Sequence, residues 1–277
     1  MIPSLPAPKI AVVEGAFLYW TTSTNSPHRP HLIKVYVPLG SPMIVSLPEH
    51  GTRLEFEAPL IVAPDVPQHV NLSGPRLTVF LEPETAGFRI SQFLRRHAAP
   101  YVPLAPALVA PLLAVRPGQA WGQRLLDTLI DTRDRMCDSP LWGSCEAPPK
   151  AILDVAARIV TGQASSREAL AEAAGMSARA LTARFREVTG LSLRRYGQWA
   201  KLTRAVAAAV MGVPFAETSA IAGFSDQAHF TRSARALLGS VPSGIPFERA
   251  LMRGNFYAGL GPRAAEFIPS LRRAAPA

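Results

Sequence analysis

Two copies of one short turn signal constrain the C-terminal half of the chain more than any other feature. The run AGMS at residues 174–177 is matched by AGFS at residues 222–225, 48 residues later. In each copy, the glycine can adopt the left-handed conformation that ends a helix, and the serine can cap the helix that follows. Each copy therefore predicts two short helices joined by a tight turn.

The first copy has the side chains that such a pair of helices needs. Ser165 and Glu168 have the spacing of a capping box at the start of the first helix. The second helix is expected from Ala178 to about Val188, with Leu181 and Phe185, four positions apart, facing inward. Its outward face would carry Arg179, Thr182, Ala183 and Arg186. This arrangement is typical of a helix-turn-helix.

A long amphipathic helix, about Leu193–Met211, is expected between the two copies, because its apolar residues recur every three or four positions. After the second turn signal, polar side chains lie near the start of the last helix: Gln227, His229, Thr231 and Arg232. One rigid helix that holds two such units would place them in successive major grooves, roughly 34 Å apart on one face of DNA.

The charge of the chain is also uneven. The 277 residues carry a net charge of +9. Residues 1–149 hold 12 Lys and Arg against 12 Asp and Glu, whereas residues 150–277 hold 17 against 8. A basic half beside a neutral half indicates a polyanionic partner such as nucleic acid or an anionic membrane. A basic surface kept for solubility is the alternative.

The N-terminal half has a different pattern. Between residues 9 and 82 the apolar runs are short and are bounded by Pro and Gly. In the run IKVYV at residues 33–37, apolar side chains alternate with Lys34 and Tyr36, which is the period of a β-strand. Several such runs at regular spacing predict a small β-sandwich or barrel.

One amphipathic helix is expected between these strands and the C-terminal half. Residues 119–136 place five apolar side chains on one helical face: Trp121, Leu125, Leu126, Leu129 and Ile130. This helix could cover its own barrel, which is the commoner arrangement, or pair with its copy in a dimer. The following residues, 138–149, contain few apolar side chains and end in Pro148 and Pro149, so the domain boundary is expected there.

The four histidines of the expected barrel do not have the spacing of a metal site. His28 and His31 are separated by two residues in a Pro-rich turn, and no third ligand follows in a metal-cupin pattern. We therefore expect no metal, no cofactor and no catalytic residues. His69 is interpreted as a pocket or rim residue, and with Trp20 and Tyr36 it forms the candidate effector pocket. The two cysteines, Cys137 and Cys145, are expected to be inert thiols.

Residues 150–248 resemble the DNA-binding domain of the AraC/XylS family of bacterial transcription regulators. The strongest match is the run GFSDQAHFTR at residues 223–232, followed by Gly239 and the run VPS at residues 241–243. The N-terminal half is similar in layout to the effector and dimerisation domain of that family.

The resemblance implies an α+β chain with four parts. Residues 1–84 would form a cupin-like β-barrel that binds an effector, and residues 85–149 a helical dimerisation segment and linker. Residues 150–250 would form an all-α DNA-binding domain of two helix-turn-helix units joined by a long helix. Residues 251–277 would be a basic tail. A homodimer is expected through the helix at residues 119–136.

The resemblance also implies roles for individual side chains. The base-reading positions would be Arg179, Thr182, Ala183, Gln227, Ala228 and Arg232. Arginine can bind guanine through two hydrogen bonds, and glutamine can read adenine. The positions suited to the DNA backbone are Ser177, Arg186, Arg194, Arg195, Lys201, Arg204, Ser225, His229 and Thr231.

These observations predict a sequence-specific, DNA-binding transcription regulator that is controlled by a small effector in the barrel. No apolar run reaches the length of a membrane span and no signal peptide is evident, so a cytoplasmic, nucleoid-associated protein without a membrane partner is expected. Two alternatives stay open. One is a metal-cupin-type enzyme domain fused to a DNA-binding domain, and the other is a nonspecific architectural DNA binder.

Overall fold

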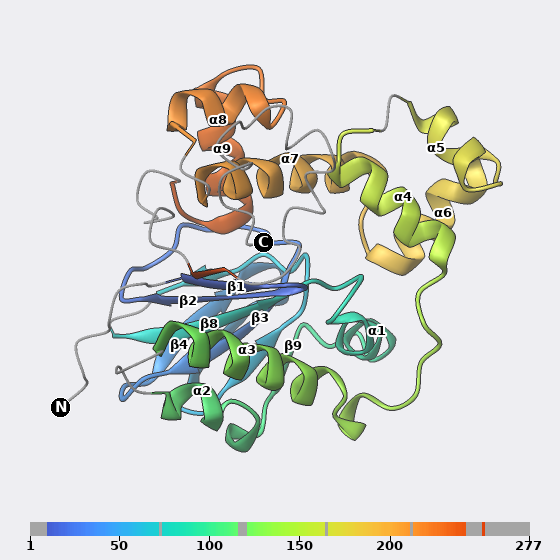
Figure 1. Cartoon of the computed structure of the whole chain (residues 1–277). Helices are drawn as coiled ribbons and strands as arrows, with labels where there is room; N and C mark the ends of the chain where they lie inside the picture. Colours follow the sequence, from blue (N-terminus) through green and yellow to red (C-terminus); the bar gives the residue numbers. More distant parts are fainter. Residues whose placement is uncertain are drawn as a thin grey trace. The chain divides into compact units, whose positions relative to one another are not determined.

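The chain forms a sheet-rich N-terminal unit and a helical C-terminal unit, as the sequence predicts (Figure 1). The N-terminal unit comprises Met1–Ala147 with Arg235–Gly254, and the C-terminal unit comprises Pro148–Ala234 with Asn255–Ala277. The structure is a computed structural model, and it describes residues 10–71, 74–115, 121–163, 166–210, 213–241 and 251–252. All but two residues of the expected basic tail, 251–277, lie outside the described residues.

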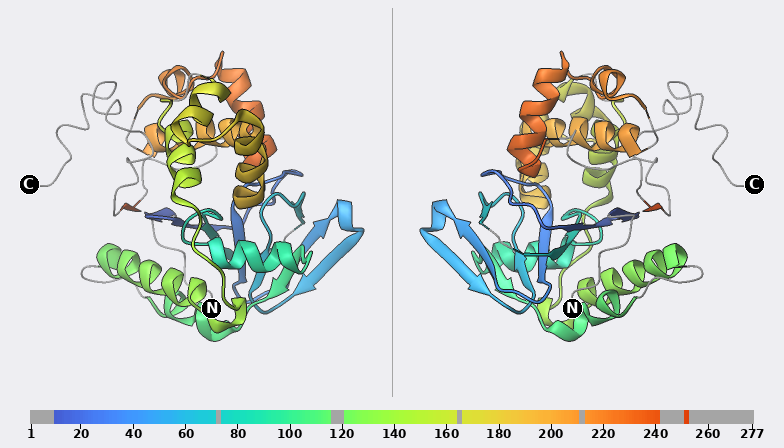
Figure 2. Two further views of the ribbon diagram at one scale, coloured as in Figure 1. Left: turned by 90° about the vertical axis from the view of Figure 1, so that its right-hand side faces the viewer. Right: turned by 90° about the vertical axis from the view of Figure 1, so that its left-hand side faces the viewer.

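The described strands of the N-terminal unit form two sheets, where the sequence pattern predicted a small β-sandwich or barrel and the family resemblance implied a barrel. The larger sheet has the order β10-β1-β2-β8-β3-β6-β9, and the smaller has the order β5-β4-β7. The smaller sheet does not hydrogen-bond to the larger one among the described strands, so the barrel is not closed. Figure 2 shows β4 and β5 as a hairpin at one side of this unit. The strands are β1 (Ile10–Val13), β2 (Ala16–Thr21), β3 (Ile33–Pro38), β4 (Met43–Leu47), β5 (Thr52–Phe56), β6 (Leu60–Val62), β7 (His69–Val70), β8 (Arg76–Leu81), β9 (Tyr101–Pro103) and β10 (Leu251–Met252).

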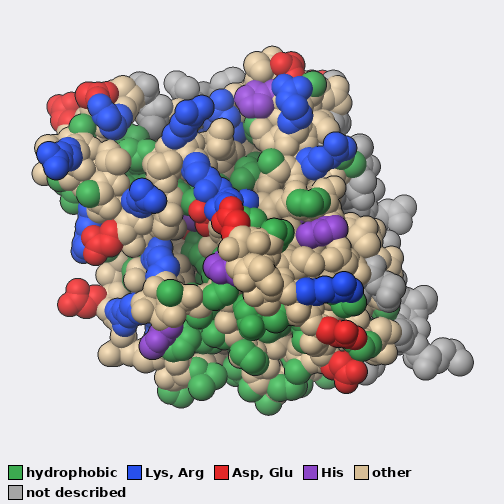
Figure 3. Space-filling model, turned by 180° about the vertical axis from the view of Figure 1, so that it is seen from behind, with side chains coloured by type: hydrophobic (Ala, Val, Ile, Leu, Met, Phe, Trp, Pro, Cys, Tyr) green, Lys and Arg blue, Asp and Glu red, His purple; other side chains and the backbone are tan. Residues whose placement is uncertain are grey.

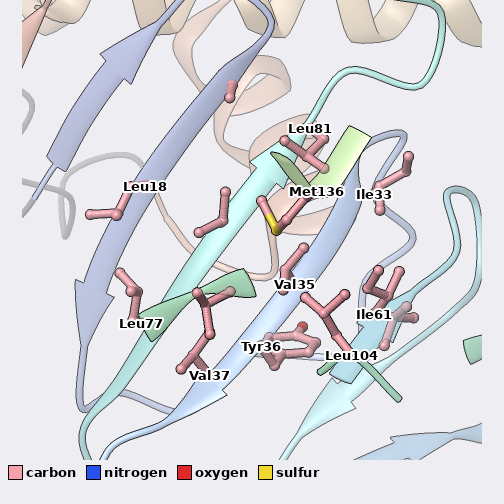
Figure 4. Close-up of a cluster of buried hydrophobic side chains, with 14 of the residues drawn as sticks. Leu18, Ile33, Val35, Tyr36, Val37, Ile61, Leu77, Leu81, Leu104 and Met136 are labelled. Atoms are coloured by element: carbon pink, nitrogen blue, oxygen red, sulfur yellow. The ribbon is translucent and has the colours of Figure 1, made fainter. Parts of the chain in front are cut away.

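The register of the larger sheet separates an apolar face from a polar one. Leu18, Val79 and Val35 are paired across β2, β8 and β3, and each is 0% exposed. The next position along each strand points to the opposite face. The apolar face forms the core, where Met136 of the helix α3 lies near Leu81 (Figure 4). The opposite face carries Lys34, Tyr36 and Arg76 and is described below.

Helix α3 (Trp121–Cys137) covers its own sheet. It packs against β1 and β2, and Leu125 and Leu129 on its inner face are 0% exposed within the core of the N-terminal unit. The sequence predicts this helix at residues 119–136, but residues 119 and 120 lie outside the described residues. The apolar side chains of α3 therefore pack against the sheet of the same chain. The other helices of the unit are α1 (Phe88–Arg96) and α2 (Ala110–Ala114), with short 3-10 turns η1 (Pro48–His50), η2 (Pro106–Leu108) and η3 (Pro140–Trp142).

The C-terminal unit consists of helices arranged around α7. This long helix packs against α4 and α8, while α5 packs against α6. Its buried side chains include Trp199, Leu202 and Ala205. No described helix is both long and apolar enough to cross a membrane. The helices are α4 (Lys150–Val160), α5 (Arg167–Ala173), α6 (Ala178–Thr189), α7 (Leu193–Val210), α8 (Phe215–Ile221) and α9 (Gln227–Leu238), of which α9 continues past the unit boundary at Ala234.

The two turn signals have the same backbone geometry. Gly175 and Gly223 have φ of +63° and +81°, as the sequence predicts for helix-ending glycines. In the first turn, the N–H of Met176 donates to the carbonyl of Ala171 at 2.9 Å. In the second, the N–H of Phe224 donates to the carbonyl of Ser219 at 2.9 Å. One detail differs from the expectation: Ser166 caps α5 by accepting the N–H of Ala169, whereas Ser165 lies outside the described residues.

Substitution of the turn glycine and of a helical glycine should have opposite effects on stability. Gly223→Ala should cost about 1–2 kcal/mol, because an L-residue is strained at positive φ. Gly197→Ala, within α7, should stabilise by about 0.5–1 kcal/mol, since a methyl group there meets no atom within 4 Å and alanine favours the helix. Calorimetry of the full chain measures both shifts in Tm. If both substitutions shifted Tm by the same amount in the same direction, the strain that we expect at position 223 would be absent.

Candidate functional site

Helix α6 exposes the four side chains that the sequence places on its outward face. Arg179, Thr182, Ala183 and Arg186 are all exposed. Leu181 and Phe185 on the opposite face are 0% exposed. Ser177 caps the helix, because its Oγ accepts the N–H of Ala180 at 3.2 Å. The exposed face therefore begins at a helix N-terminus, which is a favourable place for a phosphate group.

The ring of Phe185 fixes α6 against the long helix. It lies edge-on to the ring of Tyr196 in α7, with 5.1 Å between the ring centroids. Edge-to-face packing of two buried rings holds both in one orientation. The outward face of α6 is thus held at a defined angle to α7.

Helix α9 also exposes the side chains predicted to read bases. Gln227, Ala228 and Arg232 are exposed, and Thr231 and His229 are half-buried. Phe230 faces inward and is 1% exposed. Its ring packs against that of Phe224 with 5.2 Å between centroids, which anchors the start of α9 to the turn before it.

Sequence reasoning missed Asp226, which caps α9. Its Oδ1 accepts the backbone N–H of His229 at 2.6 Å, and its Oδ2 accepts the hydroxyl of Ser225 at 3.0 Å. The His229 backbone N–H, followed by the Ser225 hydroxyl, lowers the pKa of this carboxyl group. The signal was present, since aspartate directly before a helix is a preferred cap. Ser225 and His229, predicted to contact the DNA backbone, both belong to this capping network.

The cations of α7 have different environments. Arg194 is exposed, whereas Arg195 and Lys201 are half-buried. The ammonium of Lys201 lies 6.0 Å from the centroid of the Phe224 ring. Figure 3 shows Lys and Arg side chains over the helices of the C-terminal unit.

Arg204 joins the ends of two helices. Its Nη1 donates to the carbonyl oxygens of Ile159 and Val160 at 3.0 and 2.8 Å, at the end of α4. Its Nη2 donates to the carbonyl of Ala222 at 3.2 Å, at the end of α8. Burial lowers the pKa of this guanidinium group. The sequence assigned Arg204 to the DNA backbone, but its donors are directed at helix C-termini, where a cation is favourable.

In the N-terminal unit, the three predicted pocket residues do not lie together. Tyr36 pairs with Thr78 of β8 and Trp20 pairs with Leu77, so these two rings lie on opposite faces of the larger sheet. His69 is half-buried on β7 of the smaller sheet. Of the three, Tyr36 is the one on the polar face, where it is 1% exposed and donates its hydroxyl to Oε1 of Gln68 at 2.5 Å.

The polar face contains buried side chains that sequence reasoning left aside. Lys34 and Arg76 are 1% and 2% exposed. The Nζ of Lys34 lies 2.5 Å from Nε2 of His28. Burial, and then the charge of Arg76, lower the pKa of Lys34 well below its usual value. Burial, with the nearby Lys34, lowers the pKa of His28 to about 2, so its imidazole is neutral.

The remaining histidine and cysteine side chains form no metal site in the described part of the chain. His31 is buried, and its Nε2 lies 3.1 Å from Oε2 of Glu84. No group of three or more His, Cys, Asp or Glu side chains could hold a metal ion among the described residues. Cys137 and Cys145 are free thiols, and burial raises the pKa of Cys137 to about 12.

Comparisons with known proteins agree with the features of α5 to α9. The model of a helix-turn-helix domain family, of AraC type, matches residues 170–245. Residues 170–245 thus match an AraC-type helix-turn-helix domain, as the resemblance to the AraC/XylS family implies. The chain is a DNA-binding transcription regulator. A comparison with curated proteins finds no match.

The fold of this regulator is similar to that of ToxT from Vibrio cholerae. The structure of ToxT bound to an unsaturated fatty acid matches with a TM-score of 0.54 at 8% identity, covering 83% of this chain and 93% of ToxT. A second structure, bound to (E)-4-(8-methylnaphthalen-1-yl)but-3-enoic acid, matches with a TM-score of 0.52 at 9% identity, covering 83% and 96%. An apo variant matches with a TM-score of 0.56 at 8% identity, covering 85% and 98%. At 8–9% sequence identity, these matches show a similarity of fold alone.

Removal of the Arg204 guanidinium should destabilise the C-terminal unit. Arg204→Met keeps the aliphatic stem but leaves three helix-end carbonyl groups without their donor, and hydrogen bonds to a charged group contribute about 1.5–3 kcal/mol. Arg194→Met, at an exposed position of the same helix, should change stability by less than about 0.5 kcal/mol. Calorimetry of the two full-length variants measures their Tm values. Equal Tm values would show that Arg204 does not join the helices.

Proposed function

We propose that this regulator reads DNA with two helix-turn-helix units, α5–α6 and α8–α9, and that a small effector bound by its N-terminal unit changes its DNA affinity. The single observation that carries the first part is the repeated geometry of the two turns, each ended by a glycine at positive φ. Helix α7 connects the pairs and would place them in successive major grooves. The proposal assigns no enzymatic reaction to the chain.

The exposed faces of α6 and α9 support an assignment of base-reading residues. On α6 these are Arg179, Thr182 and Ala183, which share one face because they are three and four positions apart. On α9 the proposed residues are Gln227, Ala228 and Arg232, all exposed. The two arginines would bind guanine, while Gln227 would bind adenine.

A second group of residues is proposed to contact phosphates and so to set orientation and salt dependence. It contains exposed or half-buried cations and polar groups near helix N-termini. We propose Ser177, Arg186, Arg194, Arg195, Lys201, Ser225, His229 and Thr231 for this role. Arg204 is left out, because three backbone carbonyl groups already take its donors.

We propose a separate role for each of four segments of the chain. Residues 1–84 form a cupin-like effector domain, and residues 85–149 a helical segment and linker that supports dimerisation. Residues 150–250 form the DNA-binding domain, and residues 251–277 a basic tail. A cytoplasmic, nucleoid-associated location would accompany this role.

Control by an effector is supported by the ligands of the similar fold. ToxT structures contain an unsaturated fatty acid in one case and a substituted butenoic acid in another. Both ligands are small organic acids. The N-terminal unit of the present chain has a face lined by buried polar side chains, with Tyr36 among them, that would suit such a ligand.

Base reading and phosphate binding should be separable by two arginine substitutions. Arg179→Ala should cost about 1–3 kcal/mol on the preferred site and relax the base preference at one position. Arg194→Ala should weaken binding to all sequences and reduce the salt slope by about one. The preferred site is first selected from random duplexes with the purified full chain, and fluorescence anisotropy then gives each Kd.

The affinities for preferred and for random DNA distinguish base reading from phosphate binding. If Arg179→Ala lost the same affinity on random and on preferred DNA, Arg179 would not read a base. If the unsubstituted chain bound random and preferred duplexes equally, the protein would be a nonspecific DNA binder and the proposed sequence specificity would be wrong.

A homodimer through α3 is proposed to use the side of the helix that faces away from the sheet. That side exposes Arg124, Asp127 and Asp131, whereas the apolar side packs in the core. Asp131→Arg also removes the exposed ion pair between Asp131 and Arg135. It should lower the dimer fraction in sedimentation velocity with only a small loss of Tm, because an exposed ion pair contributes at most about 1 kcal/mol. A chain that sediments as a monomer at all concentrations would exclude this interface.

A further inference from the structure

The last turn of α9 belongs to the N-terminal unit, whereas the rest of this helix belongs to the C-terminal unit. The boundary lies between Ala234 and Arg235, and the side chains proposed to read bases, Gln227, Ala228 and Arg232, lie before it. The sequence of α9, QAHFTRSARALL, contains no glycine or proline at which a helix would bend. Whatever holds its last turn therefore also holds its base-reading face.

A loop of the N-terminal unit binds the end of α9. We call residues 25–29 the clamp loop. Its donors are the backbone N–H groups of Arg29 and Ser26 and the side-chain amide of Asn25, and the acceptors are the carbonyl groups of Ala236, Gly239 and Leu238, at 2.8, 2.9 and 3.1 Å respectively. The last carbonyl groups of a helix have no partner within the helix. The clamp loop supplies partners for them.

Gly239, the residue after α9, lies directly against the clamp loop. Its φ is +74°, and its N–H donates to the carbonyl of Arg235 at 2.9 Å, which closes the helix. A Cβ at this position would lie 2.5 Å from Nδ1 of His28 and 2.8 Å from the carbonyl oxygen of Ser26. Only glycine lets the loop and the helix end approach each other this closely.

The clamp loop is itself fixed to both sheets of the N-terminal unit. The N–H of Asn25 donates to the carbonyl of Val70 in β7 at 3.4 Å. Just before β7, His28 and Gln68 exchange backbone hydrogen bonds at 3.0 and 2.9 Å. Arg76 of β8 donates to Oδ1 of Asn25 at 2.5 Å. Because this donor faces the oxygen of the amide, the nitrogen of the amide is directed to the end of α9.

A second attachment lies further along the chain. Strand β10 pairs in parallel with β1, and Leu251 is the partner of Ala11 in this ladder. The side chain of Leu251 packs on α3, where a Cβ on Gly122 would lie 3.1 Å from its Cδ2. The segment that follows α9 is thus bound to the N-terminal unit at two places.

We propose that the clamp loop positions the base-reading face of α9 and thereby makes the N-terminal unit part of DNA sequence recognition. This inference rests on the proposed reading of bases by α9. Asn25, Ser26 and Gly239 are positioning residues, because they act on the DNA through the helix. Helix α6 lies wholly within the C-terminal unit. Loss of the clamp should therefore relax the base preference of α9 and leave that of α6 unchanged.

The test measures the base preferences of the two helices separately in the full-length protein. Preferred sites are selected from random duplexes and sequenced. Arg179→Ala identifies the base positions that α6 reads, and Arg232→Ala identifies those that α9 reads, because each variant loses the guanidinium group of one helix. The clamp variants, Gly239→Ala and Asn25→Asp, are then compared with the unsubstituted protein at both sets of positions.

Gly239→Ala should open the clamp, because its methyl group would overlap His28 and the backbone of Ser26. We expect the preference at the α9 positions to fall by about fivefold or more, since a displaced arginine loses its bidentate contact with guanine. Gly51→Ala is the matched control. Gly51 has φ of +59° and a Cβ there meets no atom within 4 Å, so this variant has the same kind of backbone strain without the overlap. It should leave both sets of preferences unchanged.

Asn25→Asp should open the clamp without backbone strain. Its carboxylate still accepts from Arg76, but it places an oxygen against the carbonyl of Leu238, to which the amide donated. The preference at the α9 positions should fall as it does for Gly239→Ala. Asn71→Asp makes the same change of charge at an exposed position of the same unit and should have no such effect. If Gly239→Ala does not fold, the result for Asn25→Asp decides alone.

The outcomes separate this inference from the proposed function. Relaxed preference at the α9 positions alone supports both. If the clamp variants lower Tm but keep the preferences of the unsubstituted protein, or relax both sets of positions equally, the clamp loop is purely structural. The inference is then wrong, while base reading by α9 stands. If Arg232→Ala changes no base preference, α9 does not read bases, and the proposed function fails at this helix together with the inference.

Discussion

Burial of the larger sheet on both faces is the constraint on which the N-terminal unit depends. Every residue of its strand β8 is buried, from Arg76 to Leu81. One face carries aliphatic side chains and is covered by α3. Together they form the core of the N-terminal unit. The other face must then enclose polar side chains. Among these polar side chains, Lys34 and Arg76 are 1% and 2% exposed.

The C-terminal unit depends on a different kind of constraint, the termination of helices. Two glycines at positive φ end α5 and α8 with the same hydrogen bonds, and the caps Ser177 and Asp226 start α6 and α9. These are local interactions between residues close in sequence. The exposed faces of α6 and α9 follow from them, because a fixed helix start fixes which side chains point outward.

Prediction from the sequence was accordingly best in the C-terminal half. The expected helix of 178–188 is observed as Ala178–Thr189, and the expected inward pair Leu181 and Phe185 is buried. In the N-terminal half, the alternation around Lys34 correctly indicated a strand, but it did not show that the lysine is buried. Alternation reports which side chains share a face and does not report what covers that face.

The sequence by itself determined the AraC-type helix-turn-helix domain, the repeated turns and the basic half, because each of these is encoded in neighbouring residues. Only the tertiary structure decided the roles of Arg204 and Lys34. Arg204 bonds to carbonyl groups 18 to 45 residues away in the chain, and Lys34 shares a buried face with a residue of β8, far along the sequence. Long-range contacts of this kind depend on the packing of distant segments, which no local pattern contains.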